Sequence, residues 1–174
     1  DSLAADERAS EELKIETATG LIRLAEIQGS PSFSSTGEIN LAEANRQRAS
    51  AILKPMEANP DKSPELLLAL GELYAELSSA SFYIEAQTDR AIEENLKSLD
   101  YYRAYVALRP DDTKQRFTML AIDGDLGSML FRNGQGDEAL ARLETVTSDF
   151  DALLEEHPDN IDFLYGLART QRIQ

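Results

Sequence analysis

The chain has 174 residues, of which 42% are hydrophobic, so it is long enough to bury a core as one domain or as a short repeat array. Its 32 acidic and 17 basic residues give a formal net charge of -15, which argues against nucleic acid as a direct partner, because phosphate binding needs clustered Lys and Arg. The absence of cysteine excludes disulfides and thiolate metal sites, and no apolar run approaches the roughly 20 residues of a membrane-spanning helix.

The pattern of apolar residues predicts an all-α fold, because these residues recur every three or four positions in stretches rich in Ala, Leu, Glu, Arg and Gln. The first two helices are expected over about 8 to 28 and from about Glu38 onwards. The loop 29–37 between them is rich in turn-forming residues. Its Phe33 is expected to cover the edge of the repeat; the alternative is an exposed Phe33 that marks a partner site. Pro55 is expected to kink or end the second helix, because proline has no amide hydrogen to donate.

A second pair of helices is expected to begin at Ser63, which is suited to cap a helix that has Pro64 at its first position. This helix is expected to run towards Ala86. The helix that follows it is expected over about 88 to 108, where a proline at position 110 stops the pattern.

A third pair is expected over about 112 to 132 and over about 137 to 156, with Asp137 as the cap of its second helix. Asn160 is expected to cap one further helix. Because the chain starts without Met and stops at Gln174 inside a helical pattern, we expect it to be a segment of a longer protein.

An internal repeat organises these helix pairs. Pro60, Pro110 and Pro158 lie 50 and 48 positions apart, and an alanine precedes each of them by 18 or 19 positions. The three alanines are Ala42, Ala91 and Ala139. The predicted repeat units are about 8–60, 63–110 and 112–158, with a partial unit at 160–174.

The residues around these alanines resemble the tetratricopeptide repeat family, in which a small residue lets the two helices of a hairpin approach closely. In the third unit the match comprises Leu126, Gly127, Leu130, Asn133, Gly134 and Ala139. In the second unit it comprises Leu70, Gly71, Tyr74 and Ala91. The first unit, with residues 24–29, Gly37, Glu38 and Ala42, resembles the degenerate repeats that follow bacterial serine/threonine kinases and some winged-helix regulators.

The sequence also departs from the family pattern. The large residue expected four positions after the repeat alanine is Arg46, Asn95 and Leu143 in the three units, so only the third unit conforms. The spacing of about 49 residues also exceeds the usual length of about 34. The resemblance implies a single domain in which antiparallel helix hairpins stack as a right-handed TPR-like superhelix, with about three extended repeats and a partial fourth.

The resemblance implies a protein–protein interaction module, a scaffold or sensor that binds a protein or peptide on the surface lined by the first helices of the hairpins. The residues that the family pattern places there are Ile22, Glu26, Glu65, Leu68, Glu72, Glu76, Ser128, Phe131 and Arg132. Their carboxylates favour a basic or basic-amphipathic peptide. The parent is expected to be a bacterial signalling or transcription-regulatory protein. The alternative is self-association, in which an apolar stripe near Phe163, Leu164, Tyr165 and Leu167 dimerises the parent protein.

The sequence does not point to an enzyme, and we expect no catalytic, cofactor-binding or metal-binding residues. The single histidine, His157, stands before Pro158 at a helix end, where it complements the helix dipole. Asp123, Gly124 and Asp125 resemble part of a calcium loop but lack the other ligands of an EF-hand. No membrane insertion is expected, and the compartment is open between the cytoplasm and, for a parent with an upstream membrane span, the periplasm.

Overall fold

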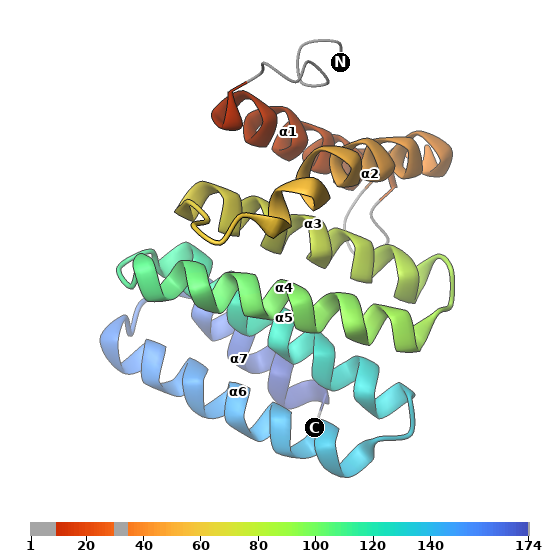
Figure 1. Ribbon diagram of the computed structural model, residues 1–174. Helices are drawn as coiled ribbons and strands as arrows, with labels where there is room; N and C mark the ends of the chain where they lie inside the picture. Colours follow the sequence, from red (N-terminus) through yellow and green to blue (C-terminus); the bar gives the residue numbers. More distant parts are fainter. Residues whose placement is uncertain (1–9, 30–34, 174) are drawn as a thin grey trace. The chain divides into compact units, whose positions relative to one another are not determined.

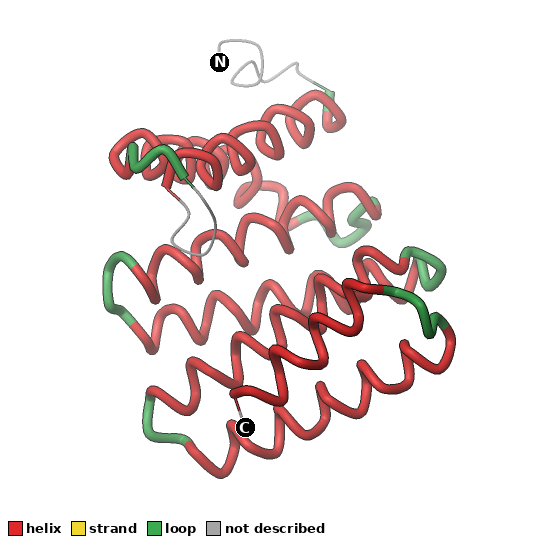
Figure 2. The backbone as a smooth tube through the Cα atoms, turned by 180° about the vertical axis from the view of Figure 1, so that it is seen from behind, coloured by secondary structure: helices red, strands yellow, loops and turns green. Residues whose placement is uncertain are grey.

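The computed structural model describes residues 10–29 and 35–173, and in this part of the chain all regular structure is helical (Figure 1). The same described residues contain no strand (Figure 2). The all-α prediction is therefore confirmed. The chain divides into two compact units, Asp1–Tyr101 (unit 1) and Tyr102–Gln174 (unit 2), and the boundary falls within α4 (Thr88–Leu108). The superhelical stacking, the repeat bounds and the single-domain organisation stay predictions.

Unit 1 begins with a hairpin of α1 (Glu11–Gly29) and α2 (Ile39–Leu53), which run antiparallel (Figure 1). Residues 8 and 9, where the predicted first helix started, and Phe33 of the predicted loop lie outside the described residues. The two helices approach closely at Gly29, where an added Cβ would lie 2.6 Å from Cβ of Ala42. A short 3-10 helix, η1 (Lys54–Ala58), follows α2, so the prediction that Pro55 ends the helix is confirmed.

The second hairpin of unit 1 contains α3 (Pro64–Tyr83) and the first part of α4. The predicted cap is confirmed, because the backbone N–H of Leu66 donates to Oγ of Ser63 at 3.2 Å. Helix α3 ends three residues before Ala86, which has a left-handed φ of 54° and turns the chain into α4. The N–H of Gln87 donates to the carbonyl oxygen of Ser81 at 2.8 Å and closes this turn.

The core of unit 1 joins both hairpins. Its buried side chains come from α1, α2 and α3, and they are Ile15, Ala18, Leu21, Ile22, Ala49, Leu53, Leu66, Ala69, Leu70, Leu73, Tyr74 and Leu77. Serine hydroxyls join α3 to α4: Ser78 donates to the carbonyl oxygen of Ala91 at 2.8 Å, and Ser98 donates to that of Gly71 at 2.8 Å. These bonds let the two helices pack closely without leaving the hydroxyls unpaired.

Unit 2 contains the end of α4, α5 (Thr113–Arg132), α6 (Gly136–Glu156) and α7 (Ile161–Ile173). The Asn160 cap is confirmed, because its Oδ1 accepts from the N–H of Phe163 at 3.2 Å. The predicted Asp137 cap is wrong. Helix α6 begins at Gly136, directly after a tight turn in which Gly134 has a φ of 80°, so Asp137 lies inside the first turn of the helix.

Two glycines set the packing of unit 2. An added Cβ on Gly127 of α5 would lie 2.7 Å from the side chain of Leu143 of α6, and one on Gly166 of α7 would lie 2.5 Å from Phe150 of α6. Gly127 is therefore a helix-contact residue, as predicted. The core around these contacts comprises Leu120, Val146, Phe150, Leu153 and Phe163.

Candidate partner-binding surfaces

Between Glu65 and Phe82, only one narrow row of side chains on helix α3 of unit 1 is accessible to solvent. The residues of this row, which we call the α3 stripe, are Glu65, Leu68, Glu72, Ala75, Ser79 and Phe82. All remaining residues from 66 to 81 are buried. A spacing of three and four positions keeps the stripe on one face of the helix. Three of the predicted residues, Glu65, Leu68 and Glu72, belong to it.

The structure corrects two predicted placements in unit 1, because Glu76 and Ile22 are buried. The next accessible residue after Glu72 is Ala75, three positions later, and not Glu76, four positions later. Glu76 therefore points to the interior of unit 1. Ile22 packs in the core of unit 1. Sequence reasoning missed Ala75, Ser79 and Phe82, although continuing the spacing of Glu65, Leu68 and Glu72 by three and four positions finds all three.

A buried ion pair explains the inward position of Glu76. Nη1 of Arg46 on α2 donates to Oε1 of Glu76 on α3 at 2.9 Å, and Nε of Arg46 donates to Oε2 of Glu43 at 3.0 Å. Burial raises the pKa of Glu76 to about 7; Arg46 acts in the opposite direction, and the nearby Glu26 adds to the rise. The pair thus links the two hairpins of unit 1 with a carboxyl group that titrates near neutral pH.

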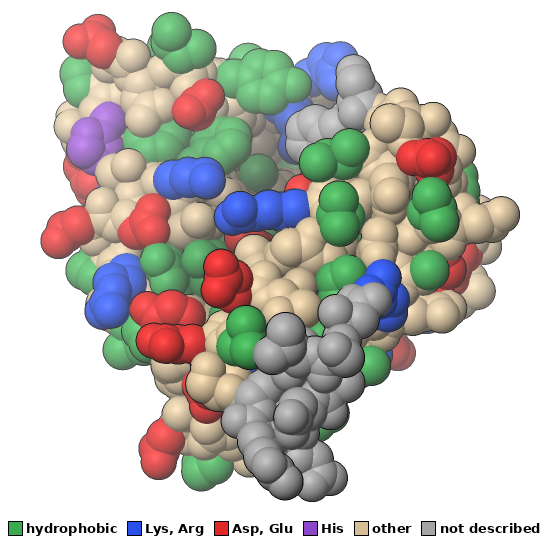
Figure 3. All heavy atoms as spheres, turned by 90° about the horizontal axis from the view of Figure 1, so that it is seen from above, with side chains coloured by type: hydrophobic (Ala, Val, Ile, Leu, Met, Phe, Trp, Pro, Cys, Tyr) green, Lys and Arg blue, Asp and Glu red, His purple; other side chains and the backbone are tan. Residues whose placement is uncertain are grey.

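Unit 1 contains 101 of the 174 residues, 19 of the 32 acidic residues and 9 of the 17 basic ones, so acidic residues are about as frequent in unit 1 as in unit 2. Glu26 of α1 is exposed, as predicted, and so is Glu65 of α3. On the face drawn in Figure 3, acidic, basic and apolar side chains are mixed, and the acidic ones form no separate patch. Such a surface offers both charge and apolar contact to a partner.

The three predicted residues of unit 2 lie on the second half of α5. Ser128 is half-buried, and its hydroxyl donates to the carbonyl oxygen of Gly124 at 3.4 Å. Phe131 and Arg132 are exposed at the end of the helix, which ends at Arg132. The structure therefore places Phe131 and Arg132 on an accessible surface and gives the hydroxyl of Ser128 a bond within its own helix.

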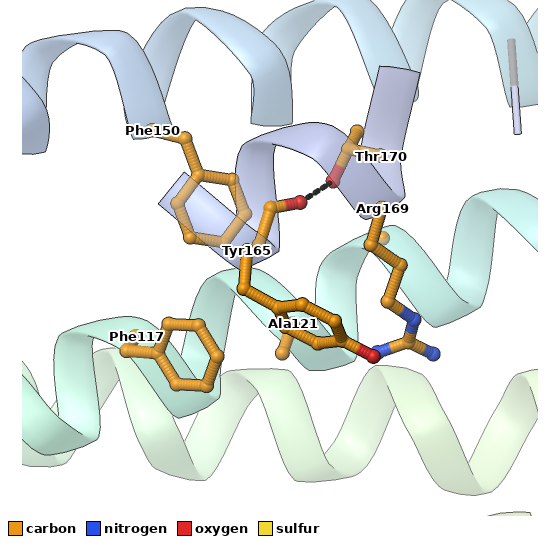
Figure 4. Close-up of a pocket in the computed structure, with 8 residues that line it drawn as sticks. Phe117, Ala121, Phe150, Tyr165, Arg169 and Thr170 are labelled. Carbon is orange, nitrogen blue, oxygen red and sulfur yellow. Dashed lines mark hydrogen bonds between the residues drawn. The ribbon is translucent and has the colours of Figure 1, made fainter. Parts of the chain in front are cut away.

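A small cavity lies between α5, α6 and α7 of unit 2 (Figure 4). It measures about 20 Å³, room for about one water molecule. Phe117 and Phe150 line one side, and Tyr165 lies over Ala121 with its hydroxyl towards Arg169. The small size of Ala121, Gly124 and Gly166 leaves this space open beneath the tyrosine ring; the full lining is Phe117, Ala121, Gly124, Phe150, Tyr165, Gly166, Arg169 and Thr170.

The charged groups beside these helices pair with one another inside unit 2. Arg169 of α7 forms an ion pair with Asp125 of α5, where burial raises the pKa of Asp125 and the arginine opposes that rise. In an open depression of about 320 Å³, the carboxylate of Asp123 pairs with Arg142 and, at 3.2 Å, with Arg103. Asp123 and Asp125, the two acids of the calcium-like fragment, therefore bind arginines.

Metal-ligand clusters and membrane-spanning helices are both absent from the described residues. Within residues 10–29 and 35–173, no three side chains of His, Cys, Asp or Glu gather as the ligands of a metal ion would. None of the helices in that same part of the chain is long and apolar enough to cross a membrane.

Comparisons with family models, with curated proteins and with solved structures find no match to this chain. The resemblance to tetratricopeptide repeats therefore stays a prediction from the sequence.

Proposed function

We propose that this chain is a protein–protein interaction module that binds a basic, amphipathic peptide along the α3 stripe of unit 1. The observation that carries the proposal is the composition of the stripe. Carboxylates at Glu65 and Glu72 alternate with apolar groups at Leu68, Ala75 and Phe82 on one accessible line. A peptide helix or strand that presents Lys or Arg beside apolar side chains matches both features.

Long-range charge supports the same partner class. Unit 1 carries ten more acidic than basic residues, so it attracts a cationic peptide before contact is made and raises the association rate. The apolar positions of the stripe then add contact area that does not depend on salt. By analogy with the repeats that the sequence resembles, the module would serve a bacterial signalling or transcription-regulatory protein.

The test measures binding of a labelled synthetic peptide of alternating Lys and Leu blocks by fluorescence anisotropy. We expect the double variant Glu65→Lys/Glu72→Lys to weaken binding about tenfold or more, equal to about 1.4 kcal/mol. The matched control, Glu138→Lys/Glu144→Lys, changes the same net charge at exposed positions of α6 in unit 2 and is expected to bind like the parent.

Two results would overturn the proposal. One is equal weakening by the control variant, which would mean that total charge alone attracts the peptide. The other is unchanged binding by the α3 double variant. Circular dichroism of each variant verifies the helical fold, which these exposed and half-buried positions are expected to leave intact.

A further inference from the structure

Helix α7 of unit 2 carries apolar side chains on two opposite faces. Its inner face packs on α5 and α6 through Phe163, Gly166 and Thr170, which are buried. Its outer face presents Ile161 and Leu164, whose exposed fractions are 78% and 49%, and Ala168, which is also exposed. Tyr165, 66% exposed, lies at the edge of this face, with its ring over Ala121 of α5. This outer face is separate from the α3 stripe and from the function proposed for unit 1.

The outer apolar residues form one continuous surface. Ile161, Leu164, Tyr165 and Ala168 are spaced by three, four and seven positions, so their side chains are neighbours along the helix. Isolated exposed apolar residues are common on protein surfaces, but a contiguous group of large ones marks an interaction site. The small side chain of Ala168 next to Tyr165 lets another helix approach closely at this point.

The charges at the two ends of this face identify what fits it. Asp162 stands in the first turn of α7 and Arg172 in its last turn, and both side chains are exposed. Neither forms an ion pair with a described residue of its own chain. When two copies of α7 pack antiparallel about a twofold axis near the middle of the helix, Asp162 of each copy lies beside Arg172 of the other.

The same antiparallel register brings Tyr165 of one copy next to Ala168 of the other, so a large residue meets a small one on both sides of the axis. The helix dipoles also run in opposite directions in this arrangement, which is favourable. In a parallel arrangement Asp162 would face Asp162 and Arg172 would face Arg172. The outer face of α7 is therefore complementary to itself in the antiparallel direction.

We propose that the outer face of α7 binds the same face of a second copy of this chain and forms an antiparallel homodimer. The contact buries Ile161, Leu164 and Tyr165 of both copies and pairs Asp162 with Arg172 twice.

The first test is sedimentation velocity of the chain over a wide concentration range. We expect the parent chain to change from monomer to dimer as its concentration rises, and Leu164→Asp to remain monomeric. Leu140→Asp is the matched control, because Leu140 of α6 has a similar exposed fraction of 47% but lies on another helix. Thermal melting shows whether each variant is folded, which is expected because both leucines are half exposed.

The second test determines the direction of the pairing. Asp162→Arg and Arg172→Asp alone are each expected to weaken the dimer several-fold, and the double variant is expected to restore it, because the exchange recreates the opposite charges. A parent chain that is monomeric at every concentration, or a dimer that Leu164→Asp leaves unchanged, would overturn the proposal and leave the face to a different protein. A dimer that the double charge exchange does not restore would overturn the antiparallel arrangement. None of these results depends on peptide binding by the α3 stripe.

Discussion

The two units place different chemistry at one equivalent position of the sequence repeat. Four residues after the repeat alanine, unit 1 has Arg46 and unit 2 has Leu143, and each side chain is only 2% exposed. Leu143 lies against Gly127, whereas Arg46 needs the carboxylate of Glu76. The comparison shows that the helix hairpin fixes burial at this position, and that a charged residue is accepted there when a neighbouring helix supplies the opposite charge.

The second hairpin of unit 1 also buries a polar residue four positions after its repeat alanine. Asn95, four residues after Ala91, is also buried, and its Oδ1 has no hydrogen-bond partner. A buried polar atom without a partner costs about 1–3 kcal/mol. Unit 1 thus buries more polar side chains than unit 2. Substitutions at these positions measure how these side chains change the free energy of unfolding.

The largest expected effect comes from breaking the buried ion pair. Arg46→Leu, which gives unit 1 the residue of unit 2, is expected to lower the free energy of unfolding by about 3 kcal/mol, because Glu76 is left buried without its partner. Urea denaturation followed by circular dichroism measures this change. The double variant Arg46→Leu/Glu76→Leu is expected to recover most of the loss, since it removes both buried charges. A single variant as stable as the parent would show that the pair contributes nothing.

A smaller effect is expected from pH. The pKa of Glu76 rises from its ordinary value of 4.5 to about 7 on folding, so between these values the folded chain holds a proton that the unfolded chain has released. Stability from this group is therefore lost as the pH rises through 7. By linkage, the chain is expected to be about 1 kcal/mol more stable at pH 6 than at pH 8.

The control for the pH prediction is Glu76→Gln, which keeps an oxygen acceptor near Arg46 but cannot titrate. This variant is expected to lose most of the difference in unfolding free energy between pH 6 and pH 8. If the variant keeps the full difference, the titrating group lies elsewhere in the chain.

The smallest effect is expected at the hairpin turns, where the units differ again. Ala86 of unit 1 and Gly134 of unit 2 both have left-handed φ angles, of 54° and 80°. Glycine adopts this conformation without the steric cost of a Cβ. Ala86→Gly is expected to stabilise the chain and Gly134→Ala to destabilise it, each by about 0.5–1 kcal/mol in thermal or urea unfolding. Changes of the same sign in both variants would contradict this explanation.

Much of the fold was predictable from local chemistry. Ser63 and Asn160 cap helices as their side chains and positions predict, and Pro55 ends α2. The prediction for Asp137 is wrong because Asp is a common cap, whereas the turn at Gly134 makes Gln135, two residues earlier, the cap of α6. Backbone geometry of this kind is not visible in residue preferences alone.

The candidate surface was predictable only in part. Glu65 lies on the α3 stripe. The family pattern also predicts Glu76 on this surface, but Glu76 is buried, and its burial depends on Arg46, which is 30 positions away in the sequence. A signal did exist, because Arg46 occupies a position where the repeat pattern expects a large buried residue. A buried arginine requires a carboxylate partner. The pattern could not identify which of the many glutamates that partner is.

Helix α6 fits its neighbours through two matched pairs, Leu143 with Gly127 and Phe150 with Gly166. Within each pair the larger side chain occupies the space that the missing side chain provides, so the two positions are not free to change independently. Among homologous sequences, we therefore expect covariation: a larger residue at 127 accompanied by a smaller one at 143, and the same exchange between 166 and 150. The packing of α6 against α5 and α7 would then be detectable in an alignment as two pairs of covarying positions.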